Sequence, residues 1–134
     1  MNQEIVGRFV LDAAFKVHTK LGAGLLESVY EAALARELTK QGLHVERQKP
    51  IQVFYDGELL NEVGFRADLI VDGLVVFELK SVSEVTDLFK KITYNYLRLI
   101  PLQLAFLINF NEVHLKNGIT RIARGAEGKT FFAQ

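Results

Sequence analysis

Two carboxylates and a lysine lie within a stretch of the chain that otherwise has the composition of buried β-strands. Residues 65–81, FRADLIVDGLVVFELKS, are rich in β-branched and aromatic residues and contain one Asp-Gly pair, which is typical of a hairpin. Asp68, Glu78 and Lys80 fall inside these strands, with Arg66 just before them. Buried charges are costly unless they are paired or hold a metal ion. These residues are therefore the first candidates for a functional site.

The same residue types are those required for metal-assisted cleavage of a phosphodiester. Carboxylate oxygens hold Mg²⁺, the metal activates water, and an ammonium group stabilises charge on the phosphate or orients the nucleophile. The alternative is a pair of surface salt bridges, Asp68–Lys80 and Glu78–Arg66, which contribute little to stability. The spacing D-x₉-E-x-K leaves both interpretations open.

The turn between the two strands decides whether the carboxylates share a face of the sheet. A two-residue turn at Asp72-Gly73 would pair Asp68 with Phe77, so that Glu78 points to the other face. A three-residue loop at 71–73, with Gly73 in the left-handed region as a G1 bulge, would pair Ile70 with Leu74. Glu78 would then lie diagonally beside Asp68 on one face. The sequence permits both turns, and we expect the second.

Hydrophobic periodicity predicts the elements that must hold these residues. Helices are expected near 3–20, 25–41 and 83–99, and strands near 44–55, 58–63, 65–71, 74–80, 102–110, 113–116 and 119–123. The residues expected to face the core from the first two helices are Ile5, Val6, Phe9, Val10, Ala13, Val17, Leu26, Val29, Tyr30, Ala33, Leu34 and Leu38. This order of elements predicts an α+β fold with a mixed sheet.

Composition limits the class of protein. A chain of 134 residues is expected to form one domain over 1–134, and zero cysteines exclude disulfides and thiolate sites. No apolar run is long enough to cross a bilayer, and the start, MNQEIVGRF, does not resemble a signal peptide. We therefore expect a cytoplasmic protein without membrane partners. Because the net charge is zero, nucleic-acid binding would need a local basic patch.

Several motifs together resemble a known family. Asp68 followed by Glu78-Leu79-Lys80 is similar to the D…E-x-K core of the PD-(D/E)XK nuclease superfamily, and residues 24–30, GLLESVY, resemble the signature of the GxxExxY protein family. The stretches VERQKPIQVFYDG, FRADLIVDG, VVFELKSV, YNYLRL and LAFLINFN follow in that family's order. The resemblance covers about residues 5–124. It implies a restriction-endonuclease-like αβββαβ core, a mixed sheet flanked by helices.

The resemblance also implies roles for single residues. Asp68 and Glu78 match the metal-binding carboxylates, the carbonyl of Leu79 matches a further ligand, and Lys80 matches the catalytic lysine. Glu27 matches a glutamate contributed by the first core helix. With Gly24 as the N-cap, however, Glu27 would be the third helical residue, where a carboxylate also satisfies free N–H groups. The ion implied is Mg²⁺ or Mn²⁺.

Two tyrosines and one missing glutamine concern the support of this site. Tyr30 is either a core aromatic or a donor to Glu27. Similar proteins often carry a Q-x-x-x-Y pattern after E-x-K, and here the equivalent positions are Ile92 and Tyr96. Ile92 continues an apolar stripe that includes Phe89, so core packing explains it. The loss of the glutamine puts catalytic competence, though not the ligands, in question.

The opposite side of the same predicted helix carries Lys90, Lys91, Tyr94 and Arg98. These residues are either a phosphate-contacting patch with an aromatic group for base stacking or an ordinary solvated face. Our interpretation of the whole sequence is a metal-dependent nuclease acting on DNA or RNA. The alternative is a weakly active nuclease-fold module that binds nucleic acid or a protein partner. Action as a homodimer is a further expectation, because one such core covers little of a duplex.

Overall fold

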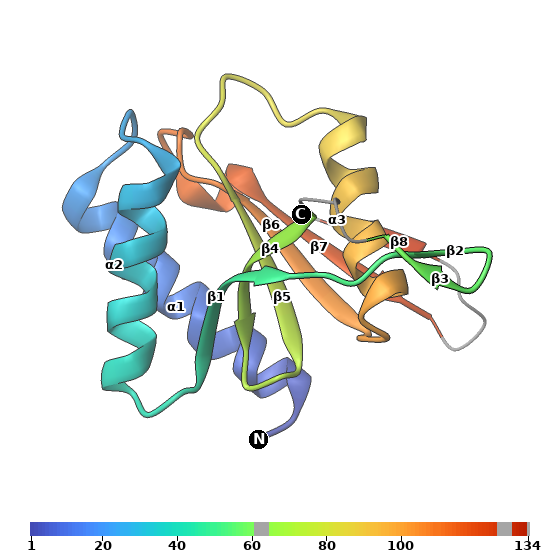
Figure 1. The fold of residues 1–134 in the computed structure, drawn as a ribbon. Coiled ribbons are helices and arrows are strands. Elements are labelled where there is room, and N and C mark those ends of the chain that lie inside the picture. The colour runs from blue at the N-terminus through green and yellow to red at the C-terminus, as the bar shows by residue number, and fades with distance from the viewer. Residues whose placement is uncertain (61–64, 126–129, 134) are drawn as a thin grey trace.

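The computed structural model describes residues 1–60, 65–125 and 130–133 (Figure 1). Within them, three helices cover a six-stranded mixed sheet. The helices are α1 (Gln3–Leu21), α2 (Glu27–Lys40) and α3 (Asp87–Leu99), with a short 3₁₀ helix η1 (Leu115–Gly118). The strands are β1 (Val45–Pro50), β2 (Phe54–Tyr55), β3 (Glu58–Leu59), β4 (Arg66–Val71), β5 (Val75–Lys80), β6 (Leu104–Asn109), β7 (Ile119–Arg124) and β8 (Thr130–Ala133). The predicted α+β fold is confirmed.

The sheet has the strand order β1-β4-β5-β6-β7-β8, so β1 and β8 are its edges. β5 and β6 are parallel and are connected through α3, whereas the other neighbours are antiparallel. Strands β2 and β3 pair only with each other and form a hairpin that projects beyond the sheet (Figure 1). We call this hairpin, residues 54–59, the arm. An Asp56-Gly57 turn closes it, with both residues at positive φ.

The two faces of the sheet carry separate hydrophobic cores. Helices α1 and α2 pack on one face, against residues such as Leu69, Phe77 and Phe106, and α3 packs on the other, against Val76 and Leu107. All six residues of β6 are buried because both of its faces are covered, which explains its uninterrupted apolar sequence. No helix in the described ranges is both long and apolar enough to span a membrane.

The hairpin register differs from the prediction. Val71 pairs with Val75, and Leu69 with Phe77, so the three-residue loop is 72–74 and not 71–73. Asp72 and Gly73 both have positive φ, 53° and 65°. The reason is a contact outside the hairpin: the backbone N–H of Asp72 donates to the carbonyl of His44, and its carboxylate accepts from the His44 N–H, each at 2.8 Å. The loop is therefore shaped by the segment before β1.

The start of α2 was also predicted wrongly. The N-cap is Leu26 and the helix begins at Glu27, rather than at residue 25 after a Gly24 cap. The preceding bend is fixed by Tyr30, whose hydroxyl donates to the Gly22 carbonyl at 2.6 Å and accepts from the Leu25 N–H at 3.1 Å. Its ring is stacked on Phe110, 4.5 Å between centroids. Glu27 is thus the first helical residue, not the third.

Four residues predicted to face the core lie instead at the surface: Ile5, Phe9, Leu26 and Val29. The buried stripe of α1 is shifted and includes Gly7 and Ala14. Gly7 lies against the Phe106 ring, where an added Cβ would be 3.0 Å from the ring. Small residues thus bring α1 close to the sheet, and the larger side chains flanking this stripe point outward.

Other boundaries differ for local reasons. The third helix, predicted from residue 83, begins instead at Asp87, because the hydroxyl of Thr86 caps it by accepting from the Phe89 N–H. The strand predicted at 44–55 ends at Pro50. The strand predicted at 113–116 is replaced by η1. The second half of the strand predicted at 58–63 lies outside the described residues.

Candidate active site

The site begins where β4 and β5 stop pairing through their backbones. The last paired residues toward the open end are Leu69 and Phe77, and one further step along each strand sets Asp68 opposite Glu78. There the side chains replace the ladder. The Glu78 carboxylate accepts from the Asp68 N–H at 2.9 Å, and the Asp68 carboxylate accepts from the Leu79 N–H at 2.8 Å. The register brings the two carboxylates together directly across the strands, not diagonally as predicted.

Burial makes the ionised forms of these two acids less favourable. Glu78 is 5% exposed, and burial, followed by the neighbouring Asp68 charge, raises the pKa of Glu78 to about 8. Burial also raises the pKa of Asp68, although the hydrogen bond from Leu79 opposes this shift. Two acids that are removed from water and close to each other favour a proton or a cation in their place.

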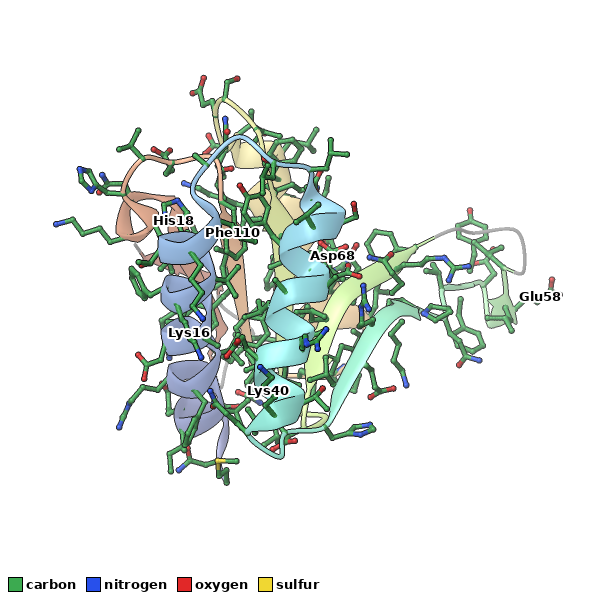
Figure 2. The ribbon with its side chains drawn as sticks, turned by 90° about the vertical axis from the view of Figure 1, so that its left-hand side faces the viewer. Lys16, His18, Lys40, Glu58, Asp68 and Phe110 are labelled. Atoms are coloured by element: carbon green, nitrogen blue, oxygen red, sulfur yellow. The ribbon has the colours of Figure 1, made fainter. Side chains whose placement is uncertain are left out.

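Asp68, the more accessible acid of the pair, lies beside α2 (Figure 2) and lines a small pocket at the first turns of that helix. The pocket has a volume of about 370 Å³ and is lined by Glu27, Ser28, Glu31, Gln48, Asp68 and Leu79. Helix α2 therefore contributes two carboxylates, one turn apart, to the same hollow as Asp68. The predicted glutamate Glu27 is exposed and belongs to this hollow.

Two polar residues that line the pocket were not predicted from the sequence. Glu31 is 7% exposed; its carboxylate accepts from the side-chain amide of Gln48 at 2.5 Å and from Arg47 at 3.1 Å. The Gln48 amide also donates to Asp68 at 3.1 Å. A signal for Glu31 was present, because it stands three and seven residues before the buried Leu34 and Leu38, at core spacing. Gln48 offered no comparable signal.

Lys80 leaves the same strand two residues after Glu78. Its ammonium lies 4.8 Å from the centroid of the Phe89 ring on α3, and its charge lowers the pKa of both acids against the larger effect of burial. Among the ion pairs of the described residues, neither Asp68–Lys80 nor Glu78–Arg66 occurs. The salt-bridge alternative therefore does not describe this cluster.

The chain after β5 is held in place by two polar anchors. The Ser81 hydroxyl donates to the Leu25 carbonyl at 2.6 Å, which ties the end of β5 to the start of α2. The buried Asn109 side chain binds both backbone groups of Val82, at 3.1 and 3.0 Å. These bonds fix the direction in which the strand leaves the site.

Of the two interpretations of Tyr30, the buried core aromatic is the one that the structure has, whereas Tyr96 lies near the acids. The hydroxyl of Tyr30 bonds to Gly22 and Leu25, not to Glu27, so its contacts are those of the α1–α2 bend. The Tyr96 hydroxyl donates to the Arg66 carbonyl at 2.5 Å. Burial, and then the charges of the acidic pair, raise the pKa of Tyr96, which places it close to the site. Ile92 is half-buried in the apolar cluster around α3.

The basic residues on α3 have different individual surroundings. Lys91 lies over the Tyr94 ring, 5.1 Å from its centroid, and Lys90 is half-buried. Arg98 lines a larger hollow of about 960 Å³ at the base of the arm, together with Arg47, Lys49 and Phe54. Of the four predicted residues, Arg98 alone lines this hollow.

The donor set fits a hard divalent ion in its chemistry. No three His, Asp or Glu side chains within the described ranges are already arranged to hold a metal ion. The acidic pair nonetheless offers oxygen donors without an ion-pair partner, and a carboxylate oxygen that accepts one N–H keeps a second lone pair. Leu79 adds a backbone carbonyl. Its N–H bonds to Asp68, so its C=O also points to the β4 side, where the strands separate.

Comparison with known families agrees with this arrangement. The family model described as the PD-(D/E)XK nuclease superfamily matches residues 4–122. The chain belongs to this superfamily. No curated protein and no solved structure shows a significant match. The narrower likeness to the GxxExxY family stays a prediction.

Replacing Tyr30 by Phe tests whether its hydroxyl serves the bend or the acids. We expect Tyr30→Phe to lower the free energy of unfolding by about 1 kcal/mol, because Gly22 and Leu25 lose their partner. Mn²⁺ should change the melting temperature of the variant by the same amount as that of wild type. Urea unfolding measures the first effect, with the exposed Tyr55→Phe as the control. A lost Mn²⁺ response with unchanged stability would contradict this assignment.

The raised pKa of Glu78 predicts how stability depends on pH. Between pH 4.5 and about 8 the unfolded chain loses a proton that the folded chain keeps. The free energy of unfolding should therefore fall as pH rises, by at most about 1.4 kcal/mol per pH unit for one proton. In Glu78→Gln the new side chain does not titrate but can still accept from the Asp68 N–H. The free energy of unfolding of this variant should therefore decrease less with rising pH than that of wild type.

Urea unfolding in EDTA at pH 5, 6, 7 and 8 measures the two slopes. Glu58→Gln, at an exposed position on the arm, is the matched control and should follow wild type. Parallel curves for wild type and Glu78→Gln would show that Glu78 ionises normally.

Proposed function

We propose that this protein is a metal-dependent nuclease that hydrolyses phosphodiester bonds of DNA or RNA. The observation that carries the proposal is the pair of cross-strand hydrogen bonds where β4 and β5 separate: the Glu78 carboxylate accepts from the Asp68 N–H, and the Asp68 carboxylate accepts from the Leu79 N–H. Lys80 follows on the same strand, and the family match covers the whole of this region. The three groups correspond in type and order to the D…E-x-K core.

Each residue has a defined part in this proposal. Asp68, Glu78 and the Leu79 carbonyl would hold Mg²⁺ or Mn²⁺, with Glu27 contributing from α2. The ion, when bound, would stabilise charge on the phosphate and lower the pKa of water. Lys80 would place an ammonium beside the phosphate oxygens or orient the attacking water. The Lys80 ammonium itself lies over the Phe89 ring on the α3 side, and this cation–π contact limits where it can reach.

The nucleic acid would be bound in part by the hollow at the base of the arm. Its lining combines Lys49 and Arg98 with the exposed ring of Phe54, and cations beside an exposed aromatic side chain suit a phosphate backbone with unstacked bases. Arg47, which lines this hollow, pairs with Glu31, which lines the acidic pocket, so one ion pair connects the walls of the two hollows. We include action as a homodimer in the proposal, with sedimentation as its measurement.

Lysine removal separates catalysis from metal binding. With Mn²⁺ or Mg²⁺, wild type should cleave at least one of single-stranded DNA, duplex DNA and RNA. Lys80→Ala should lower the cleavage rate at least about a hundredfold, the usual effect of removing one group that stabilises transition-state charge. Calorimetric binding of Mn²⁺ should persist in the variant, because Lys80 is not a ligand. The exposed Lys116→Ala is the control.

Retained cleavage in Lys80→Ala would remove the lysine from the mechanism. Binding without cleavage by wild type, with either ion, would instead favour the second candidate, a nuclease-fold module that binds nucleic acid or a protein. That candidate is favoured by one observation: Ile92 presents an apolar side chain where similar proteins carry a glutamine.

Salt dependence tests the hollow at the base of the arm. In EDTA, Arg98→Ala should weaken binding and reduce the slope of log K against log salt by about one, because one phosphate contact no longer releases a counterion. Lys116→Ala, away from the hollow, should leave the slope unchanged. Fluorescence anisotropy at several salt concentrations gives both values. An unchanged slope for Arg98→Ala would place the nucleic acid elsewhere.

A further inference from the structure

Gln48 on the edge strand β1 has an unusual backbone conformation. Its φ is 50°, in the left-handed region that residues other than glycine seldom adopt. The pairing continues on both sides, Arg47 with Leu69 and Lys49 with Ala67, so no inserted residue explains the distortion. A strained residue that interrupts no register is held there by its surroundings, which is typical of functional positions.

The side chain of Gln48 connects the two carboxylates of the acidic pocket. Its amide nitrogen donates to Asp68 at 3.1 Å and to the buried Glu31 at 2.5 Å. The amide orientation follows from chemistry, because both partners are acceptors and only the NH₂ end of an amide donates. One neutral group therefore orients a carboxylate of β4 against a carboxylate of α2.

The two carboxylates that Gln48 connects differ in the charge of their other partners. Arg47 contacts Glu31 through both Nε and Nη2 at 3.1 Å, so Glu31 has a cationic partner. Asp68 receives its hydrogen bonds from Gln48 and the Leu79 N–H, both of which are neutral. Its orientation is thus fixed while its negative charge is left available.

We propose that Gln48 is a positioning residue that orients Asp68 for a divalent cation without neutralising it. This inference rests on the proposed function and adds a residue from β1 to a site otherwise built from α2, β4 and β5. A lysine at position 48 could make the same hydrogen bonds, but its charge would compete with the ion. A neutral amide, in contrast, orients Asp68 and leaves the negative charge of Asp68 available to the ion.

The test uses Gln48→Gly, because glycine adopts a φ of 50° without steric cost and so removes the amide while keeping the backbone. In EDTA, NMR should show faster exchange of the Leu79 amide, by about tenfold, since the freed Asp68 carboxylate no longer holds it in one orientation. The Leu107 amide, in the middle of β6, is the internal control. This readout needs neither metal nor activity.

The second readout is the affinity for Mn²⁺ alone, measured by calorimetry. Loss of a group that orients a ligand typically lowers metal affinity about 10–100-fold, which is the fall expected for Gln48→Gly. Gln48→Lys should bind Mn²⁺ more weakly still, although it restores a donor. A purely structural role for Gln48 would instead make the lysine variant equal to or better than the glycine variant.

The two proposals fail in different ways. Unchanged Leu79 exchange and unchanged Mn²⁺ affinity in Gln48→Gly would overturn the positioning role and leave the nuclease proposal intact. No Mn²⁺ binding by wild type, together with faster Leu79 exchange in the variant, would overturn the metal-dependent function. That result would still support Gln48 as the group that orients Asp68.

Discussion

The end of the β4–β5 hairpin depends on two acids that replace a backbone ladder. Asp68 and Glu78 each accept an N–H from the opposite strand, at 2.8 and 2.9 Å respectively, and these bonds let the strands separate without leaving buried donors unpaired. The same separation turns the Leu79 carbonyl toward the gap. Substituting either acid by an apolar residue would strand an N–H group inside the sheet, so the fold and the proposed chemistry depend on the same two side chains.

The surrounding elements are placed so that other residues reach this point. The Tyr30 hydroxyl fixes the bend before α2, and Ser81 ties the end of β5 to that bend. Together they hold the first turn of α2, with Glu27, against the open end of the hairpin. On the other face, Phe89 of α3 contacts Lys80. Most contacts of the GxxExxY-like motif, residues 24–30, thus position α2, whereas its glutamate, Glu27, lines the pocket.

Periodicity was sufficient for the fold class, since β6 and the β4–β5 hairpin have sequences that only a doubly covered sheet explains. It was insufficient for the turn register, because Asp72 is held by His44, 28 residues earlier. Gln48 could not be found for the same reason: its partners Glu31 and Asp68 are 17 and 20 residues away. Gln48 lies inside one of the resembling stretches, VERQKPIQVFYDG, but the resemblance assigns it no role, because its contacts join that stretch to other parts of the chain.

A site for a cation and a stable fold make opposite demands on buried acids. Stability favours a charged partner for each carboxylate, whereas a cation site needs carboxylates whose charge is still available. The chain meets both demands by using different donors for different acids. Glu31 receives the guanidinium of Arg47, whereas Asp68 and Glu78 receive backbone N–H groups and one amide. Neutral donors satisfy the hydrogen bonds of the acidic pair, but burial still raises both of their pKa values. The remaining electrostatic cost is therefore concentrated on the two residues that we propose as ligands, and a divalent ion bound there would remove it.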